Sequence, residues 1–192
     1  MATFVRVLLV CALGLALGLL ASAYALSRLS PFDRVGLGSW ELEPHAGSTD
    51  ADPYTLARLE RTGEIPLAVG EGLQLVARVD DEGRALDARC VYNVGPRVPA
   101  ARYWTLSLID QDGWAIDNPA RRYGFRSSEI LRAGNGDFTI TVAADVRPGN
   151  WLPIGRGRPF ALALRLYDSP LGATAGAIDR STAPRVTRVG CG

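Results

Sequence analysis

The feature that most constrains this chain is a run of twenty residues without charge near its N-terminus, from Val7 to Leu26. A helix needs about 20 consecutive apolar residues to cross the hydrocarbon core of a bilayer. A cleavable signal peptide usually has a shorter apolar stretch of about 7 to 15 residues, although Ala21-Ser22-Ala23 resembles a cleavage site. We therefore expect residues 1–28 to form a transmembrane anchor, with a signal peptide as the alternative.

Arginines flank this run on both sides, since Arg6 precedes it and Arg28 and Arg34 follow it, so charge hardly orients the helix. Its signal-like architecture favours export of the remaining chain. Within the run, Gly14 and Gly18 have the G-x-x-x-G spacing that lets two helix backbones approach closely. The spacing indicates self-association through the anchor, and chance is the alternative because the run is rich in alanine, glycine and leucine.

Composition excludes several kinds of chemistry. All 21 basic residues are arginine, which removes Schiff-base catalysis and the phosphate-loop lysine. Apart from Arg6 and Arg28, 19 arginines stand against 20 acidic residues, a net charge of −1, so we expect no nucleic-acid partner. The single histidine, His45, excludes multi-histidine metal sites and supports no catalytic triad. We expect no catalytic residues, cofactor or metal.

A calcium loop is also disfavoured, although Asp110, Asp112 and Asp117 lie close together in the sequence. An EF-hand loop needs glycine at its sixth position, and Gly113 is fourth from Asp110. The pair Asp112-Gly113 is instead typical of a tight hairpin turn.

Of the three cysteines, Cys11 lies inside the apolar run and leaves Cys90 and Cys191 as an even pair. In an oxidising compartment, a bridge between them would close a loop of about 100 residues, worth roughly 3 to 5 kcal/mol in the chain-entropy model. We expect this disulfide, and the alternative is two free thiols.

Beyond the anchor, we expect an irregular linker over residues 29–51 and a single β-sandwich domain over residues 52–192. A short helix should open the domain, because Asp52 suits the N-cap, Pro53 the first turn and Gly63 the C-terminus. Alternating apolar residues and turn signals then predict strands at residues 73–79, 89–94, 102–110, 137–144 and 159–167. The predicted fold is mainly β: an antiparallel, jelly-roll-like sandwich with one short helix.

Two predicted loops carry the candidate binding residues. The long segment 111–136 contains Trp114, Arg122 and Tyr123, and loops of that length are often binding elements. A second loop contains Asn150 and Trp151 between two predicted strands. The alternative for both loops is structural, with tryptophan packed into the core and asparagine capping a turn.

The order of several motifs resembles the bacterial family called domain of unknown function 1214. The resemblance covers roughly residues 36–190 and is most specific at two of its elements, Gly149-Asn150-Trp151-Leu152-Pro153 and Leu164-Arg165-Leu166-Tyr167. It implies a β-rich fold and a short, membrane-anchored member of the family. Longer relatives join this domain to domain of unknown function 1254, so the resemblance implies a separate protein of that type as a partner. No activity is implied.

These observations lead to two hypotheses for a single-pass protein of the bacterial inner membrane whose soluble domain is periplasmic. The first is a non-catalytic envelope module that binds a protein or a glycan. The second is a hydrolase or lyase acting on envelope polysaccharide, which requires two carboxylates converging in one cleft.

Overall fold

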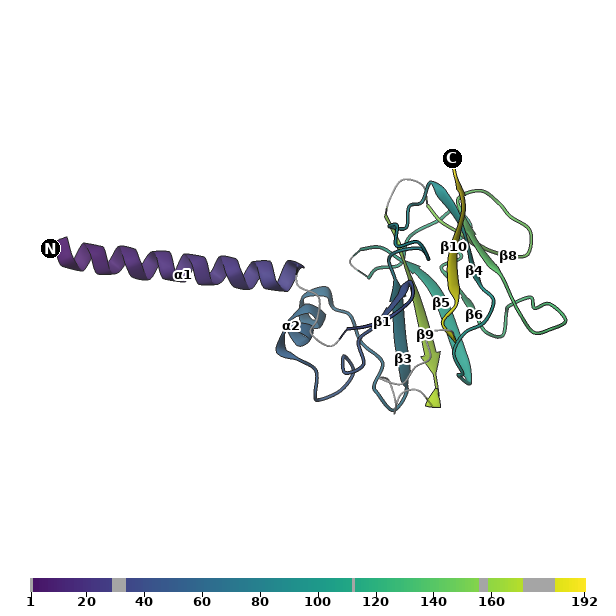
Figure 1. Cartoon of the computed structure of the whole chain (residues 1–192), viewed down its shortest axis with the longest axis horizontal. Helices are drawn as coiled ribbons and strands as arrows, with labels where there is room; N and C mark the ends of the chain where they lie inside the picture. The colour runs from purple at the N-terminus through teal and green to yellow at the C-terminus, as the bar shows by residue number, and fades with distance from the viewer. Residues whose placement is uncertain (1, 29–33, 112, 156–158, 171–181) are drawn as a thin grey trace.

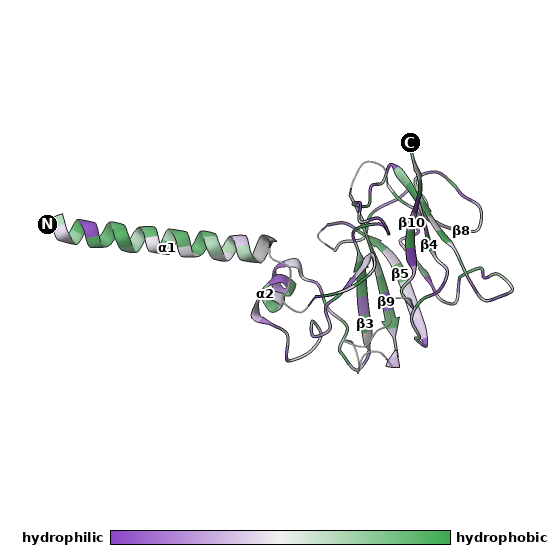
Figure 2. Cartoon of the chain, in the orientation of Figure 1, coloured by the Kyte–Doolittle hydropathy of each residue, from purple (hydrophilic) through white to green (hydrophobic). Residues whose placement is uncertain are grey.

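The computed structural model describes residues 2–28, 34–111, 113–155, 159–170 and 182–192. Helix α1 (Ala2–Arg28) extends away from a body of packed strands, and the short helix α2 (Pro53–Thr62) lies between them (Figure 1). α1 is apolar along most of its length (Figure 2). By length and composition, its segment Ala2–Ala25 suffices to cross a membrane, as expected of a membrane anchor or signal sequence.

The strands form two sheets. The larger sheet has the order β1-β2-β3-β9-β5-β6 and the smaller sheet the order β10-β4-β7-β8. The larger sheet contains β1 (Val35–Leu37), β2 (Trp40–Leu42), β3 (Gly72–Ala77), β9 (Ala161–Tyr167), β5 (Tyr103–Ile109) and β6 (Gly124–Arg126). The smaller contains β10 (Arg185–Cys191), β4 (Cys90–Gly95), β7 (Ile140–Ala143) and β8 (Asn150–Pro153). The predicted mainly β, sandwich-like fold is confirmed, and β7 and β8 form a parallel pair within it.

The two sheets share one apolar core because their strands alternate between buried and outward-facing residues. In β5, Leu106 and Leu108 are buried while Thr105 and Ser107 are partly exposed. Burying such side chains contributes roughly 1.5 to 3 kcal/mol each. Their partners in the smaller sheet include Tyr92, whose ring meets that of Phe160 edge-on at a centroid distance of 5.7 Å.

Helix α2 begins and ends where its sequence predicts. The Asp52 carboxylate accepts hydrogen bonds from the backbone N–H groups of Tyr54 and Thr55 at 2.9 and 3.1 Å. Gly63 takes the left-handed conformation, with φ of 68°, and its N–H donates to Leu59. Both ends of the helix are therefore capped.

The prediction of an irregular linker over residues 29–51 is wrong where β1 and β2 form. These strands join the larger sheet through pairing of β2 with β3, and the indole N–H of buried Trp40 donates to the carbonyl of Pro184 at 2.6 Å. Three-residue strands are too short to show an alternating pattern. Residues 29–33 lie outside the described part of the chain.

Two other predicted loops also contain strands. β6 lies within segment 111–136, and β8 occupies the stretch that contains Asn150 and Trp151. Gly149 and Pro153 are typical of turns, which conceals β8 in the sequence. An edge strand accepts proline because one side of its backbone is unpaired, and β8 is at the edge of its sheet.

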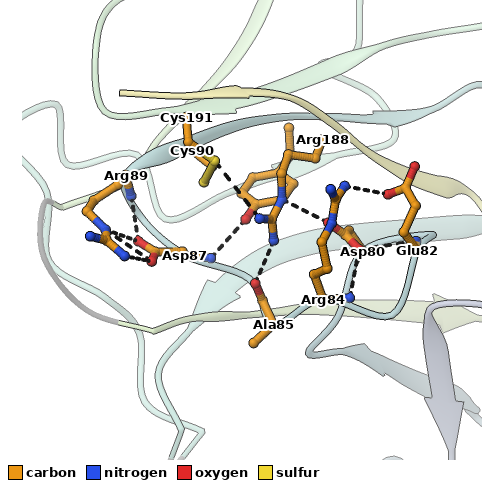
Figure 3. Close-up of a disulfide and its surroundings, with 10 residues drawn as sticks. Asp80, Glu82, Arg84, Ala85, Asp87, Arg89, Cys90, Arg188 and Cys191 are labelled. Atoms are coloured by element: carbon orange, nitrogen blue, oxygen red, sulfur yellow. Dashed lines mark hydrogen bonds and ion pairs between the residues drawn. A yellow bond between two sulfur atoms is a disulfide. The ribbon is translucent and has the colours of Figure 1, made fainter.

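The disulfide between Cys90 and Cys191 forms as predicted (Figure 3). The two residues are direct partners across β4 and β10, and the N–H of Gly192 donates to the carbonyl of Arg89 at 3.0 Å. The bond therefore fastens an edge strand at its C-terminal end. Cys11 is free and exposed on α1.

Candidate functional site

The outward face of the larger sheet carries a polar row across four neighbouring strands. Arg165 of β9 pairs with Gln74 of β3 on one side and with Thr105 of β5 on the other, and Thr105 pairs with Arg126 of β6. Because paired residues point to the same face, these four side chains leave the sheet together. Neighbouring strands lie about 4.8 Å apart, so the backbones of Arg165 and Arg126 are separated by roughly 10 Å.

This row borders a groove with a volume of about 610 Å³, here called the arginine groove. Its polar and aromatic lining residues are Thr105, Ser107, Arg121, Arg122, Tyr123, Phe125, Arg126, Glu129, Arg165 and Tyr167. Strands β5, β6 and β9 supply one part of the lining, and the turn before β6 supplies another.

Buried Asn118 organises that turn. Its side-chain N–H donates to the carbonyl of Arg122 at 3.0 Å, and its side-chain oxygen accepts from the N–H of Arg122 at 3.1 Å. Arg121 lies between them with φ of 50°, a left-handed conformation that few side chains other than asparagine and aspartate adopt. Asn118 therefore holds the backbone from which Arg121 and Arg122 project.

Glycine at position 124 brings β6 against β5. A Cβ atom there would lie within hard contact of the Leu106 carbonyl oxygen, a backbone atom that cannot move aside. Any other residue would push β6, and with it Arg126, away from the sheet.

Positive charge dominates the groove. Of the described residues that line it, four are arginines and Glu129 alone is acidic, with its carboxylate 3.5 Å from Arg126 Nε. Arg165 Nε donates to Gln74 Oε1 at 2.7 Å, and the guanidinium of Arg122 lies over the Phe125 ring at 4.7 Å. Planar guanidinium groups in such positions bind carboxylate or phosphate oxygens with paired hydrogen bonds.

Tyr123 is fixed at the rim of the groove. Its hydroxyl donates to Asp117 Oδ1 at 3.1 Å, and this hydrogen bond together with the carboxylate charge raises the pKa of the phenol. Tyr123 therefore stays neutral at physiological pH, and 42% of the residue's surface is exposed.

The predicted binding residues do not form one site. Arg122 and Tyr123 line the arginine groove. Exposed Trp114 instead lies in a turn after β5, where its backbone N–H donates to the Asp110 carboxylate. Trp151 lies in β8 of the other sheet, is partly buried and donates its indole N–H to the Ala143 carbonyl at 3.0 Å. Asp112, of the predicted Asp112-Gly113 turn, lies outside the described residues.

Asn150 has a structural role. It is 7% exposed, and its side chain donates to the carbonyls of Leu131 and Thr139 and accepts from the N–H of Leu131. Both polar atoms of the side chain are thus hydrogen-bonded within the protein. Asn150 therefore holds the backbone at Leu131 against β8 and is not accessible to a ligand.

Sequence reasoning missed the sheet-borne half of the groove, namely Arg126, Arg165 and Tyr167. The available signal was the alternation in β9, where the outward-facing Arg165 and Tyr167 alternate with buried Leu164 and Leu166. The pairing of β9 with β5, which places these residues beside β6, is not visible in the sequence.

A second arginine cluster surrounds the disulfide (Figure 3). Arg188 Nε lies 2.8 Å from Asp80 Oδ2, another nitrogen of Arg188 donates to the Ala85 carbonyl at 2.8 Å, and the guanidinium lies over the Tyr92 ring. Burial of Asp80 would raise its pKa, but hydrogen bonds from Arg84 and the charges of Arg188 and Arg84 outweigh it and lower the pKa. The cluster joins β10 to the loop after β3.

A third charged cluster joins α2 to the larger sheet around a cavity of about 60 Å³. Arg58 pairs with Glu43 and Glu64 at 2.5 and 2.7 Å, and Glu64 also accepts from Gln74 at 2.8 Å. Burial lowers the pKa of neighbouring Arg78, as does the nearby charge of Arg34. These glutamates are held by arginines, so the cluster is a structural contact.

Metal binding has little support in the described part of the chain, where no group of three or more His, Cys, Asp or Glu residues is arranged to hold an ion.

Solved structures with a similar fold are known. The VPA0106 protein from Vibrio parahaemolyticus is similar over 73% of this chain and 36% of its own, with a TM-score of 0.59 and 20% identity. An uncharacterised protein from Burkholderia cenocepacia is similar over 73% of this chain and 44% of its own, with a TM-score of 0.43 and 22% identity. The chain thus spans less than half the length of either structure.

No curated protein matches the chain in sequence. A sequence model of the family described as "Protein of unknown function (DUF1214)" matches residues 71–171, which include β3, β4, β5, β6, β7, β8 and β9. The match covers more than half of the chain and includes every residue that lines the arginine groove. The chain is therefore a member of the DUF1214 family.

Proposed function

We propose that this protein is a membrane-tethered, non-catalytic module of the bacterial envelope that binds an acidic glycan in the arginine groove. The observation that carries the proposal is the placement of four arginines around one groove on the outward face of a rigid sheet. Arg126 and Arg165 come from strands, and Arg121 and Arg122 come from a turn that Asn118 holds. Such a site is organised before a ligand arrives, which reduces the entropy lost on binding.

Features beside the charges favour a sugar chain as the ligand. Tyr123 and Tyr167 present flat apolar rings, and Thr105 and Ser107 present hydroxyl groups to the same groove. A ring next to polar groups suits a sugar, which has an apolar face and many hydroxyls. The groove volume of about 610 Å³ lies in the range of roughly 300 to 1,000 Å³ that is usual for small-ligand sites.

The lining of the groove supports binding over cleavage. Glycoside hydrolysis uses two carboxyl groups on either side of the scissile bond. Among the described lining residues Glu129 is the single carboxylate, and Arg126 lies 3.5 Å from it. A hydrolase or lyase remains the alternative function, and the binding experiment below tests it.

Two features support the proposed location in the inner membrane with the sandwich in the periplasm. The apolar helix α1 is long enough to span a bilayer once. The disulfide between Cys90 and Cys191 belongs to an oxidising compartment, because thiols in the cytosol are kept reduced.

The test is a titration of the full-length protein in detergent with oligogalacturonate, and with the same oligomer after methyl esterification of its carboxylates. We expect the acidic oligomer to bind and the esterified one to bind at least tenfold more weakly. The double variant Arg121→Gln, Arg126→Gln should lose about a hundredfold in affinity, since each of the two charged hydrogen bonds is worth roughly 1.5 kcal/mol. The control is Arg97→Gln, an exposed arginine outside the groove.

Three results would contradict the proposal. Equal binding of both oligomers would remove the role of the arginines, and shortened products would favour the enzyme. Binding of an acidic peptide such as polyglutamate without binding of the oligosaccharide would indicate a protein partner.

Association with a separate protein of the domain of unknown function 1254 type stays a second proposal. Its support is that this chain covers 36% of the VPA0106 protein, so the fold also occurs within longer chains. Co-purification of the two proteins tests it, and Trp114→Ala is the suitable variant because Trp114 is 65% exposed. Self-association through Gly14 and Gly18 also stays a prediction, and both positions are open on α1.

A further inference from the structure

Exposed apolar side chains gather on α2 and the residues just after it. Tyr54 and Leu56 expose 45% and 47% of their surfaces, and Ile65 exposes 87%. Leu56 and Ile65 also line one shallow groove together with Leu59 and Pro66, and Glu60 and Glu64 supply its polar part. Single exposed apolar residues are ordinary, but Leu56 and Ile65 border the same groove, and such a shared apolar patch indicates a surface that is covered in the working protein.

The position of α2 indicates what covers it. α1 and α2 are in contact, and α2 lies beside the C-terminal end of α1 (Figure 1). Residues 2–24 of α1 are exposed, and Ala25 is the first that is partly covered. If α1 spans a bilayer, α2 is therefore the part of the domain that lies nearest to the membrane surface.

The sandwich holds α2 in a fixed orientation. Thr55 and Leu59 are buried on one side of the helix, while the ion pairs of Arg58 with Glu43 and Glu64 fasten it to the sheet and the following loop. Burial would lower the pKa of Arg58, but the charges of Glu43 and Glu64 and their hydrogen bonds outweigh it and raise the pKa, so Arg58 stays charged. The exposed side chains are thus presented outward and cannot fold back onto the core.

We propose that α2 and residues 63–66 lie in the headgroup layer of the membrane, with Leu56 and Ile65 inserted among the lipids and Tyr54 at the interface. This inference rests on the proposed retention of α1 as an anchor. Tyrosine suits the interface because its ring is apolar and its hydroxyl stays hydrated. The contact sets the orientation of the sandwich relative to the bilayer.

The test uses full-length protein carrying Cys11→Ala in vesicles of phosphatidylethanolamine and phosphatidylglycerol. Ile65→Cys and, as a matched control, Val146→Cys are labelled with an environment-sensitive fluorophore without reductant, so that the disulfide remains. Val146 is 78% exposed and lies before β8 in the other sheet. We expect doxyl-labelled lipid to quench the probe at position 65 at least threefold more than at position 146, and iodide to show the reverse order.

Intact-mass measurement of the same samples separates the two ways of failing. If α1 is present and position 65 is as open to iodide as position 146, the lipid contact is overturned while the anchor stands. If the mature chain instead begins near Tyr24, both the anchor and the lipid contact are overturned. Circular dichroism of the labelled variants checks that each has folded.

Discussion

The arginines around the disulfide and those around the groove are chemically identical but have different surroundings. The side chain of Arg188 is 17% exposed and meets a carboxylate, a carbonyl and an aromatic ring. In the groove, Arg121 and Arg122 are exposed, and Arg126 meets its glutamate at 3.5 Å with a side chain that is 68% exposed. Since the chain has no lysine, residue type does not distinguish a structural cation from a ligand-binding one.

The difference lies in how much of each arginine's hydrogen-bonding capacity the fold itself uses. A guanidinium whose donors are satisfied within the protein stabilises the fold, and removing it leaves a buried partner unpaired. A guanidinium that is solvated in a groove contributes little to stability and keeps its donors for a ligand. The two clusters should therefore respond in opposite ways to substitution, strongly in stability for one and in binding for the other.

The largest effect is expected from breaking the disulfide. Cys191→Ser should lower the free energy of unfolding by about 4 to 5 kcal/mol, because the closed loop spans a sequence separation of 101 residues. Urea denaturation of the oxidised protein in detergent measures the change, and Cys11→Ser is the control. A loss of less than about 1 kcal/mol would mean that the bond does not restrict the unfolded chain as its loop length predicts.

The next effect concerns Asp80, whose side chain is fully buried between two arginines. Its pKa is lowered in the folded protein, so its contribution to stability is present above about pH 4 and is lost as the pH falls through the folded pKa. Asp80→Asn should destabilise the protein by about 2 to 4 kcal/mol at pH 7. The difference in the free energy of unfolding between Asp80→Asn and the parent should be smaller at pH 2.5 than at pH 7. A difference that does not change with pH would show that the charge of Asp80 is not its cause.

Arg188→Leu should have a smaller effect, about 1.5 to 3 kcal/mol at pH 7, because Asp80 keeps its bonds to Arg84. The aliphatic replacement retains part of the packing on Tyr92, so the loss reports mainly on the ion pair and the bond to Ala85. Thermal unfolding monitored by tryptophan fluorescence measures it. An unchanged melting temperature would show that Arg188 does not fasten β10.

The smallest stability effect is expected in the groove. Arg121→Gln and Arg126→Gln should each change the free energy of unfolding by less than about 0.5 kcal/mol, as is usual for exposed surface positions. The same denaturation experiment checks this alongside the binding titration. A loss above about 1 kcal/mol would show that these arginines stabilise the fold as Arg188 does, and the two clusters would then not differ.

The sequence predicted those elements whose determining residues all lie within a short stretch of the chain. The N-cap Asp52 and terminal Gly63 define α2, and alternation over seven residues defines β5. The disulfide was predictable because two cysteines remained outside the apolar helix. Short strands such as β2 and β8 were missed because three or four residues show no clear period. The turn-forming residues at the ends of β8 also indicated a loop.

Only part of the lining of the arginine groove could be predicted from the sequence. Arg122 and Tyr123 lie next to each other in the sequence, and a long segment with aromatic and charged residues indicates a binding loop. Arg165 and Arg126 meet them only because β5 lies between β9 and β6, a long-range pairing that sequence periodicity does not encode. Asn150 and Trp151 were assigned to the surface because their structural hydrogen bonds depend on a strand that was not recognised.

The order in which the chain is synthesised gives the last strand a particular consequence. β10 pairs with β4, and Asp81 accepts from the N–H of Val186 at 3.0 Å while the Pro184 carbonyl accepts from Trp40. Trp40, Asp81 and the edge of β4 therefore find these partners only after residues 184–191 have been synthesised. In a chain exported from its N-terminus, β10 would leave the translocation channel after all the strands with which it forms the sandwich. Until β10 is in place, the edge of β4 is exposed to proteases and to other chains, and a truncation within β10 would leave it in that state.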